Sequence, residues 1–284
     1  MNSTGASGVT VPPADKPGAG VLPRLASVAV LLPVTLFCLY AGGWLFAALV
    51  ALAGVLMALE WDRLVGGPAR PGLVAVVMAL ALLLAVLTTA RSGPGLGVIV
   101  LAVGLVALLA AALVERRPVS WALLGGLWLG LPTLGVVWLR GTPELGFAGT
   151  LWLLAAIWAS DTGAYAAGRG IGGPKLAPRI SPKKTWAGLA GGMAAAALVS
   201  LALAGFGYAG PAWLLAVLGA GLAVVSQVGD LAESAVKRHF GVKDSGTLIP
   251  GHGGILDRVD ALLFAVLAAL ALAALTDGPW FRWQ

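Results

Sequence analysis

The sequence predicts an all-α, polytopic integral membrane protein with about nine transmembrane helices. Of its 284 residues, 59% are hydrophobic and only 11% are charged, and the mean hydropathy is +0.95. A soluble domain of this length is nearer half apolar and about a quarter charged. The apolar residues form continuous runs of about 20 residues, which favours helices over the short alternating segments of a membrane β-barrel.

The apolar runs divide the chain into three regions. Residues 1–22 are rich in Gly, Pro, Ser and Ala, so we expect a disordered cytoplasmic tail rather than a signal peptide. Residues 23–140 hold spans one to five, which carry almost no interior polar groups. Residues 141–284 hold spans six to nine and nearly all the candidate chemistry. The expected spans are 24–41, 44–61, 72–90, 95–114, 119–139, 145–168, 185–206, 211–232 and 254–276.

The distribution of basic residues predicts the orientation of these spans. With the N-terminus in the cytoplasm, 15 of the 18 Lys and Arg residues fall inside, and Arg91, Arg140 and Arg282 fall outside. This distribution obeys the positive-inside rule. The net charge of +6 therefore follows membrane topology and does not indicate nucleic-acid binding. We expect a multi-pass protein of the cell (inner) membrane, with the loops after spans six and eight in the cytoplasm.

Small residues and the single cysteine add two constraints. Glycines recur at four-residue spacing, as at Gly126 and Gly130 and at Gly188 and Gly192, which is typical of close helix packing in lipid. Such helices are compatible with a homodimer, and the sequence leaves this open. Cys38 is the only cysteine, so an intrachain disulfide is excluded.

The eighth expected span carries a polar stripe at helical spacing. The stripe consists of Ser226, Asp230, Glu233 or Ser234, and Lys237. A solvated helix end explains Lys237 and its neighbour Arg238, but not polar residues within the apolar run. Ionisable groups inside a membrane segment are costly and indicate function by default. Asp230 is the candidate metal ligand, because Mg²⁺ prefers carboxylate oxygens and substrate phosphates.

Residues 249–260 are a second segment with candidate functional residues. Gly251, Gly253 and Gly254 flank His252 just before the ninth span, where glycines and free helix N–H groups favour an anion. For His252 the general acid–base, phosphate-donor and loop-packing roles all stay open.

The two acids of this segment have two interpretations. Asp257 and Asp260 lie three residues apart in the first turn, where acids complement the helix dipole. Two acids beside Arg258, opposite another acid-bearing helix, instead favour metal binding.

The loop after span six is basic. It carries Lys175, Arg179, Ser181, Lys183 and Lys184. The segment SPKKTWAG predicts a helix start, with Ser181 as the cap and Pro182 in the first turn. Lys183 and Lys184 at a helix start would suit a phosphate, although basic residues are also ordinary in cytoplasmic loops.

Other polar residues lie near the ends of spans. Asp161 and Tyr165 are one turn apart at the cytoplasmic end of span six, and we expect a basic partner for Asp161. Glu60 and Asp62 close span two and are interpreted as interface residues. His239 is expected at the surface.

Residues 234–260, SAVKRHFGVKDSGTLIPGHGGILDRVD, resemble the signature of the phosphatidate cytidylyltransferase (CDP-diacylglycerol synthase) family. The matching positions are Ser234, Lys237, Arg238, Lys243, Asp244, His252, Gly253, Gly254, Asp257, Arg258 and Asp260. GDLAES with Asp230, SPKKTW at 181–186, DTGAY at 161–165 and the pair Glu60 and Trp61 are also similar to the family. Ala187 stands where the family usually has Glu.

The resemblance implies the Mg²⁺-dependent reaction of CTP with phosphatidate, giving CDP-diacylglycerol and pyrophosphate at the cytoplasmic face. CTP, phosphatidate and the lipid bilayer are then the expected partners, with one or two Mg²⁺ ions as cofactor. The candidate catalytic residues are Lys237, His252, Asp257 and Arg258. The candidate substrate-binding residues are Asp161, Tyr165, Ser181, Lys183, Lys184, Ser226, Ser234, Arg238, Lys243, Gly253 and Gly254. The candidate metal ligands are Asp230, Asp257 and Asp260.

Two alternatives are weighed against this expectation. One is a CTP-dependent enzyme acting on a polyprenyl alcohol or an unusual lipid phosphate, which the spacing from Lys-Arg to His-Gly-Gly disfavours. The other is an ion-coupled transporter. Transporters place their sites near the midplane between related repeats, whereas these acids gather at one membrane face and no repeat is evident.

Overall fold

The computed structural model describes residues 21–67, 71–143, 146–249 and 253–275. Within these residues the chain forms nine α-helices and one two-stranded hairpin. The elements are α1 (Val21–Ala41), α2 (Gly43–Gly66), α3 (Leu73–Ser92), α4 (Pro94–Val114), α5 (Val119–Gly141), α6 (Gly146–Gly170), β1 (Lys175–Ala177), β2 (Ser181–Thr185), α7 (Trp186–Ala204), α8 (Ala212–His239) and α9 (Leu256–Leu275). Each helix overlaps one expected span, which confirms the all-α, polytopic fold class.

Most of these helices have the length and composition of membrane spans. Six helices of the described ranges are long and apolar enough to cross a bilayer, namely α2, α3, α4, α5, α7 and α8. Many of their large apolar side chains are exposed on the outside of the bundle, including Val106 at 68% and Val114 at 73%. A polypeptide with such a surface is suited to lipid rather than water.

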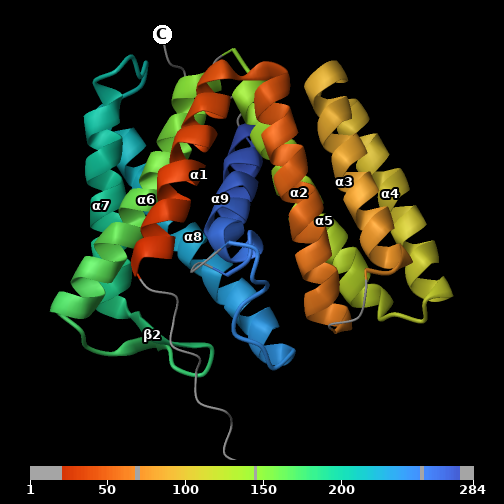
Figure 1. Cartoon of the computed structure of the whole chain (residues 1–284). Helices are drawn as coiled ribbons and strands as arrows, with labels where there is room; N and C mark the ends of the chain where they lie inside the picture. The colour runs from red at the N-terminus through yellow and green to blue at the C-terminus, as the bar shows by residue number, and fades with distance from the viewer. Residues whose placement is uncertain (1–20, 68–70, 144–145, 250–252, 276–284) are drawn as a thin grey trace, which may run out of the picture.

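Helix α9 lies in the middle of the bundle, as Figure 1 shows, and packs against α2, α5, α6 and α8. Helices α3 and α4 form one flank, and α6 and α7 form the other. The β1–β2 hairpin and the last turns of α8 lie at the lower end of the bundle in this view, and α9 begins above them, within the bundle. The segments that carry the sequence motifs therefore meet on one side of the molecule.

Glycines let the helices approach closely, as their spacing predicted. A Cβ atom added to Gly163 on α6 would lie 2.6 Å from the carbonyl oxygen of Gly191 on α7. At Gly188 it would lie 3.0 Å from the Ala164 carbonyl oxygen, and at Gly130 it would lie 2.6 Å from the Leu101 side chain. A side chain at these positions would force the helices apart, so the packing interpretation of the glycine pattern is confirmed.

The helix start expected at Ser181 and Pro182 is wrong. Residues Ser181–Thr185 form strand β2, which pairs antiparallel with β1 through Lys175 opposite Thr185 and Ala177 opposite Ser181. Helix α7 begins at Trp186, and the hydroxyl of Thr185 accepts a hydrogen bond from the Gly188 amide at 3.0 Å. Thr185 is therefore the N-terminal cap, because its side chain satisfies a first-turn N–H group that the helix itself leaves without an acceptor.

Candidate active site

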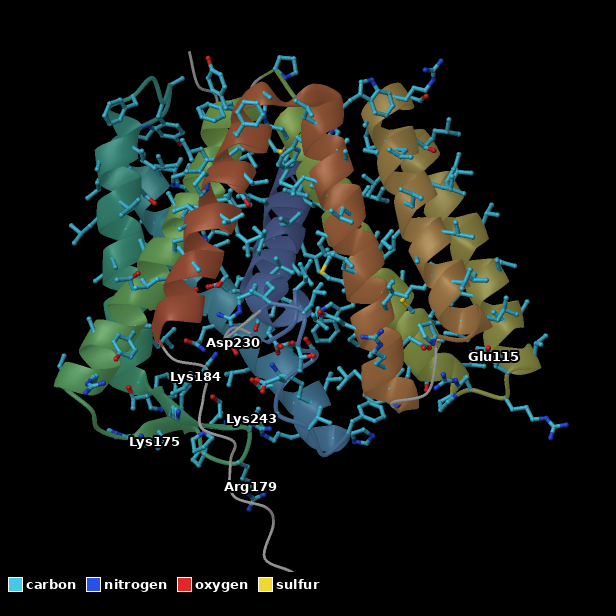
Figure 2. The ribbon with its side chains drawn as sticks, viewed as in Figure 1. Glu115, Lys175, Arg179, Lys184, Asp230 and Lys243 are labelled. Carbon is cyan, nitrogen blue, oxygen red and sulfur yellow. The ribbon has the colours of Figure 1, made fainter. Side chains whose placement is uncertain are left out.

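Asp230 and Lys184 form an ion pair that joins helix α8 to the hairpin. Figure 2 shows the two side chains directed toward each other beneath α9, with Lys243 below them and Lys175 and Arg179 on the hairpin. The Asp230 carboxylate also lies 3.4 Å from the Ser234 hydroxyl, one turn along α8. A basic partner was expected for Asp161. Lys184 from the hairpin is such a basic residue, but its ion pair is with Asp230.

Lys237 lies between two carboxylates. Its Nζ donates to Glu233 on the same helix and to Asp257 on α9, both at 2.7 Å. Glu233 is fully buried and Lys237 is 8% exposed, so this triad is shielded from solvent. One cation thus lies between two acids, and the carboxyl group of Asp260 also interacts with that of Glu233.

Four donor groups of the described residues contact the Asp257 carboxylate. Besides Lys237, they are the Ser245 amide, at 3.2 Å from Oδ1 and 3.0 Å from Oδ2, the Ser245 hydroxyl at 3.0 Å and the Gly254 amide at 2.8 Å. Gly253, whose φ is +85°, turns the chain into this position, which residues with a side chain rarely adopt. The loop before α9 therefore wraps around the Asp257 carboxylate.

Glu60 reaches the same loop from helix α2. Its carboxylate accepts hydrogen bonds from the amides of Ile255 at 2.9 Å and Leu256 at 2.8 Å. The Ser245 hydroxyl lies 3.3 Å from the same carboxylate. Glu60 was expected to mark the membrane interface at the end of span two. Its side chain is instead only 3% exposed and contacts the loop before α9, which we call the motif loop.

Further acids surround Asp230. Asp161 on α6 and Asp260 on α9 both interact electrostatically with Asp230, and Asp260 also interacts with Glu233. Lys184 and Arg258 are the cations that act on Asp161. The sequence-predicted acids from three helices thus lie in one cluster, which we call the acidic cluster: Asp161, Asp230, Glu233, Asp257 and Asp260.

The acidic cluster gathers carboxylates, the donor type that Mg²⁺ prefers. In the described part of the chain, no three His, Cys, Asp or Glu side chains are grouped closely enough to hold a metal ion by themselves. Mg²⁺ is commonly held by one or two carboxylates together with substrate phosphates, so a complete protein cage is not required. The excess of carboxylates over cations is the feature that is compatible with such an ion.

The remaining candidates divide into two groups. Lys183, Arg238, Lys243 and Arg258 have exposed side chains around the acidic cluster, and Arg238 donates to the Val242 carbonyl at 2.8 Å. Ser226 is buried and bonds to the Ala223 carbonyl of its own helix, and the Tyr165 hydroxyl accepts from Arg169. Ser181 lies in β2 and Gly254 donates to Asp257, whereas His252 and Gly251 lie outside the described residues.

Ser245 was missed as a candidate, and two other residues were named without the role that they have here. Glu233 was placed in the polar stripe as an alternative to Ser234, and the structure pairs it with Lys237 at the i, i+4 spacing. Glu60 was noted in a family-like pair but was interpreted as an interface residue. Ser245 carries no local signal, because its partners Asp257 and Glu60 lie 12 and 185 residues away in the chain.

Comparisons with known proteins give a consistent assignment. The model of the cytidylyltransferase family matches residues 22–276. A protein named phosphatidate cytidylyltransferase from Brucella suis is 38% identical over 256 residues, covering 90% of this chain and 94% of the relative. One of the same name from Pseudomonas aeruginosa is 42% identical over 272 residues, covering 90% and 98%. A third, from Staphylococcus saprophyticus, is 44% identical over 134 residues, covering 47% and 52%. The chain belongs to the cytidylyltransferase family.

Proposed function

We propose that this protein is a phosphatidate cytidylyltransferase, which transfers CMP from CTP to phosphatidate and releases pyrophosphate. One observation carries the proposal: acids and cations of the 230–260 motif converge at one end of α8 and α9. The relatives of this name from Brucella suis and Pseudomonas aeruginosa match the chain across 90% of its length, which supports the same substrates here.

The reaction needs positioning more than proton transfer. An ionised phosphate oxygen of phosphatidate attacks the α-phosphorus of CTP, and a new P–O bond forms. The bond from the α-phosphorus to the bridging oxygen breaks, and its electron pair leaves with pyrophosphate. Because the attacking oxygen is already anionic, the site must align two anions and neutralise their charge.

In this proposal Asp230 and Asp257 of the acidic cluster would hold Mg²⁺, and Asp260 is a further candidate ligand. Bound Mg²⁺ would supply positive charge to the triphosphate oxygens. For Asp257 to act as a ligand, one of its four donors must give way. Lys237 is the donor whose positive charge the ion would replace at Asp257.

The basic residues neutralise the phosphates. Lys184, which pairs with Asp230 in the structure, would be available to a triphosphate oxygen, and the exposed Lys183 and Arg258 would add positive charge. His252 stays a candidate for the pyrophosphate side of the site.

The position of the site suits a lipid substrate. Phosphatidate can keep its acyl chains in the bilayer while its phosphate group reaches the acidic cluster. CTP is available in the cytoplasm, so we place the hairpin and the loop before α9 at the cytoplasmic face of the inner membrane, in accord with the distribution of Lys and Arg.

A direct assay tests the substrate assignment. Purified protein in detergent is given Mg²⁺, CTP labelled at either the α- or the γ-phosphorus, and either phosphatidate or a polyprenyl alcohol. We expect the α label in the lipid with phosphatidate, neither label in the lipid with the alcohol, and no labelled lipid from a matched Asp230→Asn preparation. Product from the alcohol alone would reject phosphatidate as the substrate.

A further inference from the structure

We infer that Glu60 is a positioning residue for cytidylyl transfer, because it holds the start of α9 and thereby fixes Asp257. This inference rests on the proposed function for its catalytic consequence. The structural part of the inference concerns a contact between the N-terminal helices and the motif loop, and it can be measured without any substrate.

Glu60 accepts from donors that helix α9 cannot satisfy itself. The amides of Ile255 and Leu256 lie at the beginning of α9, where N–H groups have no acceptor in the preceding turn. A carboxylate at a helix N-terminus is favourable because it also complements the helix dipole. Here that carboxylate comes from α2, and all three of its donors are neutral groups.

The contact is built with little room for adjustment. A Cβ atom added to Gly246 would lie 2.9 Å from Oε1 of Glu60, and one at Gly254 would lie 2.5 Å from Oε2. Distances under about 3 Å are too short for a Cβ contact, since carbon and oxygen atoms are then well inside their optimal separation. The two glycines therefore allow the loop to close over the carboxylate.

The end of α2 that carries Glu60 is itself fixed. Trp61 is fully buried, and its indole Nε1 donates to the Trp121 carbonyl on α5 at 3.0 Å. The Trp121 ring lies 5.2 Å from His239 and 4.9 Å from Phe240 at the end of α8. Glu60 thus projects from a position packed against both α5 and the end of α8.

Ser245 connects Glu60 to the acidic cluster. Its hydroxyl lies 3.3 Å from Glu60 and 3.0 Å from Asp257, and its amide also donates to Asp257. Asp257 in turn holds Lys237. Loss of the Glu60 acceptors would free the start of α9 and shift Asp257 relative to Asp230, which misaligns the reactants without removing a group that binds CTP.

Glu60→Gln tests this role with minimal change of shape. Glutamine keeps one acceptor oxygen and places an NH₂ group against an N–H donor. We expect kcat to fall about 10- to 100-fold while the KM for CTP changes less than about 3-fold. Hydrogen exchange of the amides in residues 253–258 should accelerate in the same variant.

Asp62→Asn is the matched control. Asp62 is 2% exposed on the same helix and pairs with Arg117 at 3.6 Å, away from the motif loop. Its substitution should leave kcat per folded protein near the wild-type value and should not accelerate exchange at residues 253–258.

Two results would overturn the inference. One is unchanged exchange at 253–258 in Glu60→Gln, and the other is an equal loss of kcat per folded protein in Asp62→Asn. If wild-type protein does not turn over phosphatidate, the proposed function fails, while the exchange measurement still decides whether Glu60 holds the start of α9.

Discussion

The ammonium group of Lys237 lies 2.7 Å from the carboxylate of Asp257, and this contact joins the two helices that carry the sequence motif. Glu233 binds the same ammonium group from one turn earlier in α8. The sequence pattern alone suggests that Lys237 faces a substrate phosphate. In the structure its positive charge is engaged by two buried acids, so its loss must affect both stability and catalysis.

Lys237→Ala should therefore be damaging in two ways. Removing one member of a buried charged group leaves its partners uncompensated, at a cost of about 3–5 kcal/mol. We expect a clear drop in the thermal midpoint and a loss of kcat/KM of about 100-fold or more. His239→Ala is the control, since His239 is exposed. Equal damage from both substitutions would contradict the assignment of Lys237 to the buried triad.

Asp230→Asn should weaken metal binding. Mn²⁺ can replace Mg²⁺ as a spectroscopic probe, and its binding can be followed by electron paramagnetic resonance in the absence of CTP. We expect an affinity loss of about 10- to 100-fold and nearly abolished turnover in folded protein. Asp257→Asn should also nearly abolish turnover, whereas Asp260→Asn should be milder. Wild-type Mn²⁺ affinity in Asp230→Asn would remove this residue from the metal site.

Thr185→Ala should destabilise α7, because Thr185 is the observed cap. Loss of a helix cap costs about 1 kcal/mol, which should appear as a lower thermal midpoint. Ser181→Ala changes a residue of β2 and should leave the midpoint unchanged. The two hydroxyls are four residues apart, so the pair separates the observed helix start from the one expected at Ser181. The reverse order of effects would favour the sequence-based expectation.

Labelling of single cysteines should reveal opposite orientations for the two ends of the bundle. Arg179 on the hairpin and Ser92 at the end of α3 are both exposed, and a Cys38→Ala background removes the only native thiol. An impermeant maleimide should react with Arg179→Cys only from the cytoplasmic face of sealed vesicles. It should react with Ser92→Cys only from the other face. Reaction of both from one face would contradict the topology.

Much of the fold follows from local sequence patterns. Long apolar runs and their flanking Gly and Pro residues located the nine helices in the described ranges to within a few residues, except at the ends of α2 and α8. Helix α8 extends to His239. Its last turns are polar and pack on the loop before α9, so the length of the apolar run does not predict them. The hairpin was missed because its strands are short and exposed, without the apolar alternation that indicates a strand.

The site was predictable only in part. Asp230 stood out because charge within an apolar run is costly, and Lys237 was predicted on the same polar stripe of the helix. The contacts of Glu60 and Ser245 depend on how α2 packs against α9, and helix spacing carries no information on that packing. The pairing of Lys184 with Asp230 likewise depends on the hairpin that was missed.

The most direct test of the central claim follows two phosphorus labels into the lipid. Wild-type protein is incubated with phosphatidate, Mg²⁺ and CTP labelled either at the α- or at the γ-phosphorus. Cytidylyl transfer predicts that the α label enters the lipid fraction in equal amount to the pyrophosphate released, and that the γ label leaves entirely with pyrophosphate. Appearance of the γ label in the lipid, or no lipid label from either CTP, would contradict cytidylyl transfer to phosphatidate.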